Sequence, residues 1–367
     1  MQISVSRSKL TFVYIGERLP RYVFNSLKIA KVFSGQDLQI IANKHVYKHL
    51  KMMPVEFCAL EDFYNPEIFL KADGYLTTKS HFRNGLWQKS LERFFVLEQF
   101  MSSRNLDYFL HAELDQLLFR TDLLTSNLLK IDRTGVFLPF HGSKSAVASV
   151  FFCNSSSALG SMLEFSQSGV YYPNEMNMIA QWAQENPTRV HELPTFATEV
   201  AGGKTSNVSS ISLTDKCEIG GLVDAAQLGQ WFAGIDPRNV PIRSKPLNKF
   251  CDIETRELLS RDQLTQVKLN LNATRKSLEL NYYNEYICDL YNLHIHSKVH
   301  TGKMASIIGM SDFVGKVNMS QPISFKGTRM TQVLDFLLFR INYVQKNPVA
   351  SLKYISKEIK KFLSLHS

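Results

Sequence analysis

The sequence predicts an α/β fold in which helices flank a mostly parallel central sheet. Over the first sixty residues, short β-rich runs alternate with stretches of helical periodicity. This β-α-β-α-β order is typical of a parallel sheet with crossover helices. A further apolar run, residues 108–110, reads as a buried strand and ends in acidic residues. With 367 residues, 44% of them hydrophobic, the chain is long enough to bury a sizeable core.

The opening unit is expected to begin with a strand over residues 10–16 and a helix over 22–33, whose apolar residues form one stripe. A strand over 37–42, a short helix over 43–50 and a strand over 55–60 complete the unit. The sequence GxGxxG does not follow the first strand, so a dinucleotide-binding fingerprint is absent.

The later elements follow from the same periodicities. They are expected in this order: a helix over 85–104, the acidic strand, a helix over 122–130 capped by Thr121 or Asp122, strands over 135–140 and 146–153, helices over 154–165 and 174–184, a loop over 201–207, a short helix from about residue 225, a strand or a helix over 278–290, a strand over 291–298, and helices over 331–346 and 349–365. Asn174 is the expected N-cap of the helix over 174–184.

Composition narrows the classes of partner. The net charge of 42 − 33 = +9 suits phosphate-bearing ligands, an anionic membrane surface or nucleic acid. The arginines and aromatic residues show no stacking-platform pattern, so nucleic acid is not expected. Five scattered cysteines without a CxxC pair argue against zinc clusters and favour a reducing, cytoplasmic environment. No apolar run approaches the ~20 residues of a membrane span, so any membrane contact is expected to be peripheral.

The acidic strand carries the first candidate site. If residues 107–119 stay extended, His111, Glu113 and Asp115 share one face, because side chains alternate along a strand. Two carboxylates at this spacing can hold one hard divalent cation. The alternative is a strand end with solvated acids. His111 is expected to be a core histidine.

A second polar face lies on the strand over 291–298, where His294, His296 and Lys298 alternate with apolar residues. Two carboxylates and one imidazole suit Mn²⁺ or Mg²⁺ holding a diphosphate. We favour His296 as the metal ligand because it lies nearer Lys298, which would neutralise phosphate charge. A cation acting as a Lewis acid stabilises the charge that develops when a nucleoside diphosphate leaves a sugar.

These motifs resemble the GT-A fold of nucleotide-sugar glycosyltransferases of the bacterial glycan-biosynthesis type. The resemblance covers most of residues 10–300 and rests on these segments: 12–16 with 19–20, 87–93, 111–115, 224–230, 234–238 and 293–298. It implies a Rossmann-type sheet whose Asp-x-Asp motif binds metal and touches the donor ribose. Here the motif is Glu113-Leu114-Asp115, which departs from the pattern at its first position. Asp115 is then the expected direct ligand, and Glu113 contacts ribose, or metal through water.

Other residues receive roles with open alternatives. Tyr14, with Gly16, lines the nucleotide pocket or belongs to the core. Arg93 holds a phosphate, orients Asp115, or pairs within its own helix. Glu175 is the first candidate for general base, or else an acid stabilised by the helix N-terminus. Asp224 is the second candidate, or it binds donor sugar hydroxyls.

The expected activity is transfer of a sugar from a nucleotide-diphosphate sugar to a hydroxyl of a glycan or lipid-linked acceptor. Residues 1–300 form the expected catalytic domain, with a nucleotide-binding half over 1–145 and an acceptor half over 146–300. Residues 301–367 form a loop and helical extension, whose basic last helix would contact the inner membrane face. The alternatives are a metal-dependent phosphohydrolase or nucleotidyltransferase, and a non-enzymatic protein that binds glycan or nucleic acid.

Overall fold

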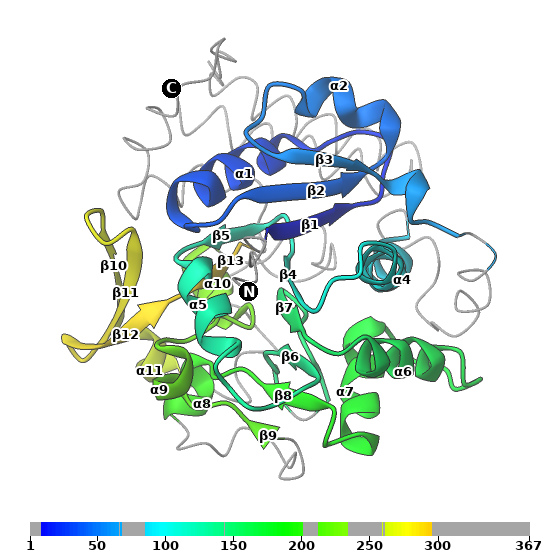
Figure 1. Cartoon of the computed structure of the whole chain (residues 1–367). Helices are drawn as coiled ribbons and strands as arrows, with labels where there is room; N and C mark the ends of the chain where they lie inside the picture. The colour runs from blue at the N-terminus through cyan, green and yellow to red at the C-terminus, as the bar shows by residue number, and fades with distance from the viewer. Residues whose placement is uncertain are drawn as a thin grey trace, which may run out of the picture. The chain divides into compact units, whose positions relative to one another are not determined.

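An eight-stranded sheet organises the structure, a computed structural model that describes residues 9–65, 67, 85–142, 144–200, 212–233, 259 and 261–295 (Figure 1). The strand order is β3-β2-β1-β4-β7-β6-β8-β9. The bounds are β1 Leu10–Tyr14, β2 Leu38–Ala42, β3 Glu56–Ala59, β4 Phe109–Ala112, β6 Val136–Leu138, β7 Val150–Cys153, β8 Val190–Glu192 and β9 Ser212–Leu213. Only β7 runs antiparallel to its neighbours among these strands, so the predicted mostly parallel sheet is confirmed.

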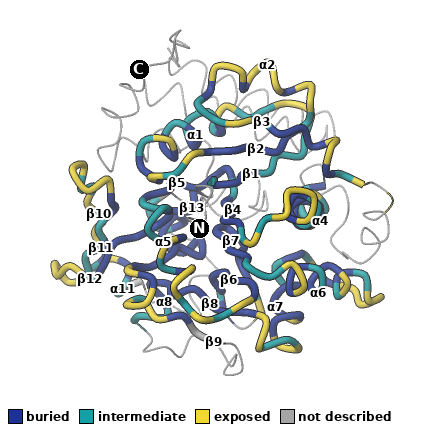
Figure 2. Tube along the Cα trace, viewed as in Figure 1, coloured by how far each residue is buried: buried dark blue, intermediate teal, exposed yellow. Residues whose placement is uncertain are grey.

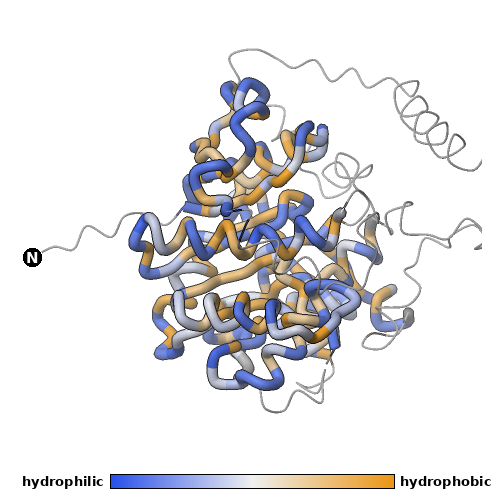
Figure 3. The backbone as a smooth tube through the Cα atoms, turned by 90° about the vertical axis from the view of Figure 1, so that its right-hand side faces the viewer, coloured by the Kyte–Doolittle hydropathy of each residue, from blue (hydrophilic) through white to orange (hydrophobic). Residues whose placement is uncertain are grey.

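Helices lie on both sides of this sheet (Figure 1). Their bounds are α1 Arg21–Phe33, α2 Tyr47–Leu50, α4 Leu86–Ser103, α5 Thr121–Leu128, α6 Ser156–Ser166, α7 Glu175–Glu185, α8 Phe196–Val200, α9 Lys216–Ile219, α10 Gln227–Ala233 and α11 Arg261–Thr265, with 3-10 turns η1 Lys44–Val46 and η2 Leu60–Asp62. Hydrophilic and hydrophobic residues alternate along the helical turns in Figure 3, as expected for helices that bury one side. The predicted helix-flanked α/β class is therefore confirmed.

One face of the sheet is covered by α4, α6 and α7. Phe94 and Leu97 of α4 join Phe151 of β7, Leu159 of α6 and Trp182 of α7 in one buried cluster. The rings of Phe94 and Phe151 lie 5.3 Å apart between centroids, a favourable aromatic contact. The strands inside this cluster are the dark, fully buried segments of Figure 2.

A second cluster joins α1 to the last strands of the described chain. Phe33 of α1 and Phe119 make an edge-to-face contact with 5.8 Å between ring centroids. They pack with residues of β5 Gln116–Leu118, β11 Ser277–Tyr282, β12 Glu285–Leu290 and β13 Asn292–His294. β13 pairs antiparallel with β5, which brings residue 294 beside residue 116. This pairing connects segments that lie far apart in the sequence.

The region over 278–290, left open between strand and helix, forms strands. β11 and β12 pair antiparallel, and β10 Val267–Asn272 completes a three-stranded sheet. The connecting residues Tyr283 and Asn284 have φ of 50° and 67°, and both belong to a two-residue hairpin loop.

Two local predictions are wrong. The acidic segment does not stay extended, because β4 ends at Ala112 and residues 114–115 form a turn before β5. His111 and the two acids therefore do not share one face of a single strand. The N-cap of α5 is Arg120, in the left-handed region at φ 44°, and no side chain caps the helix. Asn174 caps α7 as predicted, accepting a hydrogen bond from the Asn177 N–H at 3.0 Å.

Several predictions lie outside the described residues: the loop over 201–207, His296, Lys298 and both C-terminal helices. All described residues fall within one unit, Met1–Asn318, and the proposed boundaries near residues 145 and 300 remain predictions. Among the described helices, none has the length and apolar character needed to cross a bilayer.

Candidate metal centre

Glu113, Asp115 and His294 form a cluster of potential metal ligands. One ligand atom from each residue lies within 4.8 Å of the others. His294 Nε2 is 3.5 Å from Glu113 Oε2 and 3.5 Å from Asp115 Oδ1. Asp115 and His294 are buried, whereas the Glu113 side chain is 22% exposed. The cluster therefore has one side accessible to solvent.

The turn after β4 places the two acids. The Glu113 N–H donates to the Ser149 carbonyl at 3.0 Å, and the Gln116 N–H donates to the Glu113 carbonyl at 3.3 Å. This turn folds Asp115 back toward Glu113, so both carboxylates face one point although they belong to no common strand. The two acids thus converge, but a turn brings them together instead of an extended strand.

His294 reaches the cluster through β13. The Ile295 N–H donates to the Asp115 carbonyl at 2.9 Å, which fixes the end of β13 against the acidic turn. The structure thus brings His294 to the acids, and His296, which the sequence favoured, lies outside the described residues. The pairing of β13 with β5 sets His294 opposite Gln116, and this register brings the histidine to the acids.

The Asp224 carboxylate holds the main chain of His294 by a hydrogen bond. Its Oδ2 accepts hydrogen bonds from the N–H groups of His294 at 3.0 Å and Gly229 at 2.9 Å, and Oδ1 accepts one from Leu228 at 3.0 Å. Burial raises the pKa of Asp224, and these N–H donors oppose the increase. Because backbone donors occupy both oxygens, the contacts favour a positioning role for Asp224 over proton transfer.

Close packing surrounds that contact. A Cβ built on Gly229 would lie 1.7 Å from the His294 carbonyl oxygen, so only glycine fits between α10 and β13. The Asn292 side chain completes the link, donating to Gln116 Oε1 at 2.8 Å and to the Asp224 carbonyl at 3.0 Å. The position of the His294 main chain is therefore determined from several sides.

Arg93 of α4 forms an ion pair with Glu113 through its NH1 group and Oε1. The guanidinium is buried and also lies 4.8 Å from the centre of the Phe94 ring. This pair holds one oxygen of Glu113, so the other oxygen faces His294. The structure therefore pairs Arg93 with Glu113, a contact that was not among the three roles suggested by the sequence.

Glu175 begins α7 and is 3% exposed. Burial raises its pKa to about 7, and the nearby Glu113 carboxylate adds to this, while Arg93 and a hydrogen bond from Ser90 oppose it. Its Oε2 has no hydrogen-bond partner among the described residues. A buried carboxyl group with this pKa exchanges its proton near neutral pH.

The histidine beside the motif has a different character. His111 is 1% exposed, and its Nδ1 lies 3.0 Å from the Thr11 carbonyl oxygen. Burial, assisted by the Arg93 charge, lowers its pKa to about 3. His111 is therefore a neutral core residue, as expected.

Burial and nearby charge have opposite effects on His294. Burial alone lowers its pKa, but the Asp115 and Glu113 carboxylates outweigh that effect and hold the pKa above its ordinary value. The same two negative charges that favour a proton on His294 favour a divalent cation in its place. Carboxylate oxygens with one imidazole nitrogen are a suitable donor set for Mn²⁺ or Mg²⁺.

The first loop of the sheet contains the two remaining candidates. The Tyr14 hydroxyl donates to the Arg18 carbonyl, and the Gly16 N–H donates to Asn43 Oδ1 at 3.0 Å. A Cβ on Gly16 would lie 2.8 Å from the Tyr14 hydroxyl oxygen. Both residues shape the loop after β1, next to β4, which leads to the metal cluster.

No protein-family model matches the sequence, and a comparison with curated proteins finds no match. Solved structures with a similar arrangement include mouse xyloside xylosyltransferase 1, with 9% identity, a TM-score of 0.37 and coverage of 51% of this chain and 85% of that one. The bifunctional glycosyltransferase WbbM shows 11% identity, a TM-score of 0.35 and coverage of 52% and 39%.

A cytidylyltransferase from Leptospira borgpetersenii is also similar, with 12% identity, a TM-score of 0.32 and coverage of 52% of this chain and 76% of that one. These three likenesses extend over about half of this chain at low TM-scores. They assign no reaction to it, and the functional argument rests on the chain's own residues.

Proposed function

We propose that this chain is a glycosyltransferase of GT-A type that uses a divalent cation held by Glu113, Asp115 and His294. The single observation that carries the proposal is the convergence of these three side chains, with ligand atoms within 4.8 Å of one another. The donor is a nucleotide-diphosphate sugar, and the acceptor is a hydroxyl of a glycan or of a lipid-linked glycan. Mn²⁺ or Mg²⁺ is the proposed cofactor.

The cation, when bound, supplies Lewis-acid stabilisation of the departing diphosphate, typically several kcal/mol. The chain's own residues prepare the site. Arg93 orients Glu113, Asp224 holds the main chain of His294, and the turn after β4 presents Asp115. His296 and Lys298 follow β13 in the sequence, and we keep them as proposed additional ligands for metal and phosphate.

For proton transfer we propose Glu175. Its pKa of about 7 suits a group that accepts a proton near neutral pH, and general-base catalysis typically contributes ~10²–10⁴-fold. Tyr14 and Gly16 remain proposed donor contacts in the loop after β1. Peripheral contact of the basic C-terminal segment with the inner membrane face, and a cytoplasmic location, belong to the same proposal.

Calorimetric titration of UDP and GDP in the presence of Mn²⁺ tests the metal site. Wild type is expected to bind one of them only with Mn²⁺, and Asp115→Asn is expected to lose this binding. Asp132→Asn, a change at an exposed acid on a connecting loop, serves as the matched control. Equal Mn²⁺-dependent binding by wild type and Asp115→Asn would overturn the proposal.

The reaction class is tested by the products. A glycosyltransferase supplied with nucleotide sugars and Mn²⁺ releases a nucleoside diphosphate. A nucleotidyltransferase supplied with a nucleoside triphosphate and a sugar phosphate releases pyrophosphate, and a phosphohydrolase releases phosphate. Pyrophosphate or phosphate as the Asp115-dependent product would replace the glycosyltransferase proposal with one of these alternatives.

A further inference from the structure

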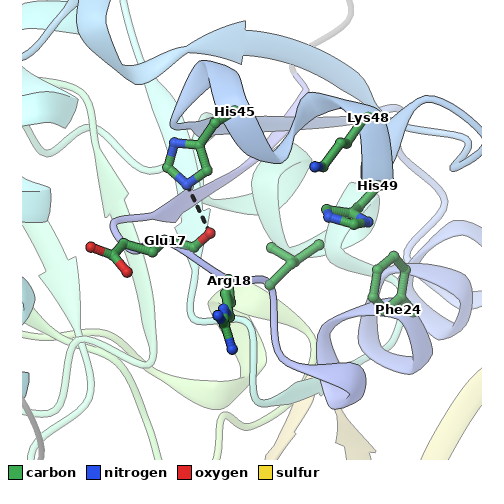
Figure 4. Close-up of a pocket in the computed structure, with 7 residues that line it drawn as sticks. Glu17, Arg18, Phe24, His45, Lys48 and His49 are labelled. Carbon is green, nitrogen blue, oxygen red and sulfur yellow. Dashed lines mark hydrogen bonds between the residues drawn. The ribbon is translucent and has the colours of Figure 1, made fainter.

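A cavity of about 410 Å³ lies between the loop after β1, the N-terminus of α1, and α2 (Figure 4). Its lining residues are Glu17, Arg18, Leu19, Phe24, His45, Lys48 and His49. The volume falls in the range of small-molecule sites, roughly 300–1,000 Å³. None of these side chains belongs to the metal cluster, and Glu17, Arg18 and Leu19 continue the loop after β1 that holds Tyr14 and Gly16.

The charge of the cavity is positive. Arg18 and Lys48 are cationic, and the imidazole of His49 can donate a hydrogen bond. Within the described part of the chain, neither Arg18 nor Lys48 forms an ion pair with a carboxylate. The carboxylate of Glu17 points away from Lys48 and His49 (Figure 4). Lys48 and His49 thus extend from α2 with no described carboxylate beside them, whereas the Arg18 guanidinium points away from both (Figure 4).

Two further features of the cavity favour a bound anion. His45 is oriented by the bond between its Nε2 and the Glu17 carbonyl oxygen at 2.8 Å. Leu19 and Phe24 flank the start of α1, whose first turn has no acidic residue and no side-chain cap. The dipole of a helix N-terminus attracts anions, phosphate above all. The positive end of the α1 dipole and the cationic lining side chains therefore both favour a bound anion.

The neighbouring lysine, Lys44, differs from Lys48 because it is paired with acidic residues. Lys44, on the same segment, forms an ion pair with Asp62, with 3.2 Å between Nζ and Oδ1, and its N–H donates to Glu61. Asp62 and Glu61 therefore serve Lys44, which leaves Glu17 as the one acid among the lining residues. We propose that the cavity is a second site, which binds the phosphate group of a phosphate ester, either a free small molecule or a lipid headgroup.

The test measures phosphate binding in EDTA, so that no divalent cation bridges the anion to the metal cluster. Calorimetry with inorganic phosphate and with glycerol 3-phosphate forms the soluble arm. Co-sedimentation with phosphatidylcholine vesicles containing phosphatidic acid forms the lipid arm. Binding in the soluble arm assigns a free phosphate ester, and binding confined to vesicles assigns a headgroup; both outcomes support the site.

The variant Lys48→Gln/His49→Gln is expected to weaken the observed binding about tenfold or more, since contacts to a charged group are the stronger hydrogen bonds. Lys51→Gln removes an exposed charge one turn further on, outside the cavity, and is expected to bind as wild type does. Asp115→Asn is also expected to bind normally. Absence of binding in both arms, or equal loss in Lys51→Gln, would overturn the proposal.

Discussion

The main-chain N–H of His294 donates a hydrogen bond to Asp224 Oδ2 at 3.0 Å, although the two residues are seventy positions apart. The same carboxylate accepts the N–H groups at the start of α10, so it joins this helix to β13. Through this contact, a residue that offers no ligand atom to the metal cluster determines where His294 stands. The position of His294 in the metal cluster therefore depends on the buried carboxylate of Asp224.

Asp224→Asn is expected to weaken Mn²⁺ binding about tenfold and to lower the free energy of unfolding by about 2 kcal/mol, because the amide group offers only one oxygen to the three N–H donors. Calorimetry with Mn²⁺ and urea unfolding measure the two effects. Asp289→Asn is the matched control, since Asp289 is also buried and pairs with Arg275. It should lose stability but bind Mn²⁺ normally; equal Mn²⁺ affinities in wild type and Asp224→Asn would remove the positioning role.

Two glycine-to-alanine substitutions are expected to have opposite signs. Gly229→Ala puts a methyl group 1.7 Å from the His294 carbonyl oxygen, and it should cost more than about 3 kcal/mol because two backbone segments must separate. Gly160→Ala in α6 meets no atom within 4 Å and should gain about 0.5–1 kcal/mol from helix propensity. Thermal unfolding compares them. Similar midpoints for both variants would contradict the close contact between α10 and β13.

Local patterns were sufficient for the opening β-α-β-α-β unit, because its first two strands are apolar runs and its first helix carries an apolar stripe. They also singled out Glu113 and Asp115. They did not reveal the turn at residues 114–115, since nothing in Glu-Leu-Asp prevents an extended conformation. The sequence favoured His296 because it is nearer Lys298; the position of His294 beside the acids depends on the pairing between β13 and β5, which local patterns do not reveal.

The contacts of Asp224, the hairpin loop over 283–284 and the partner of Arg93 could not be predicted from local sequence patterns either. Asp224 stood out as an acid, but its hydrogen bonds go to main-chain groups that carry no sequence signal. The hairpin loop Tyr283-Asn284 lacks the Asn-Gly pair that predicts such loops, so β11 and β12 could not be separated. Arg93 was considered as a partner within its own helix, yet its carboxylate partner lies on the turn after β4.

Arg93→Met is expected to lower the stability of the metal-free protein by about 2–3 kcal/mol, because Glu113 loses its partner while it stays largely buried. Added Mn²⁺ should restore part of this loss, since a cation again lies beside the carboxylate. Thermal unfolding with and without Mn²⁺ measures this recovery. Arg104→Met, a change at an exposed arginine that ends α4, should show neither effect. The same Mn²⁺-induced shift in both variants and wild type would contradict the Arg93–Glu113 coupling.

Glu175 gives the stability a distinct dependence on pH. Its pKa is raised from 4.5 to about 7 in the folded protein, so the folded state holds a proton that the unfolded state releases. The associated stability is fully present below pH 4.5 and is lost as the pH rises through 7, about 3 kcal/mol in all. Glu175→Gln keeps the neutral form at every pH. It should therefore stabilise the protein by less than about 1 kcal/mol at pH 5 and by about 3 kcal/mol at pH 8.

Urea unfolding of wild type and Glu175→Gln at both pH values checks this difference. Glu185→Gln, near the other end of α7, controls for the loss of a negative charge on the same helix, where the exposed carboxylate accepts a hydrogen bond from Gln181. A stability difference independent of pH would show that the Glu175 carboxyl titrates normally. If transfer activity is present, Glu175→Gln should also reduce kcat by at least ~10²-fold without changing Mn²⁺ affinity, because general-base catalysis contributes that much. A more stable protein with unchanged kcat would leave Glu175 as a buried structural acid and assign proton transfer to another group.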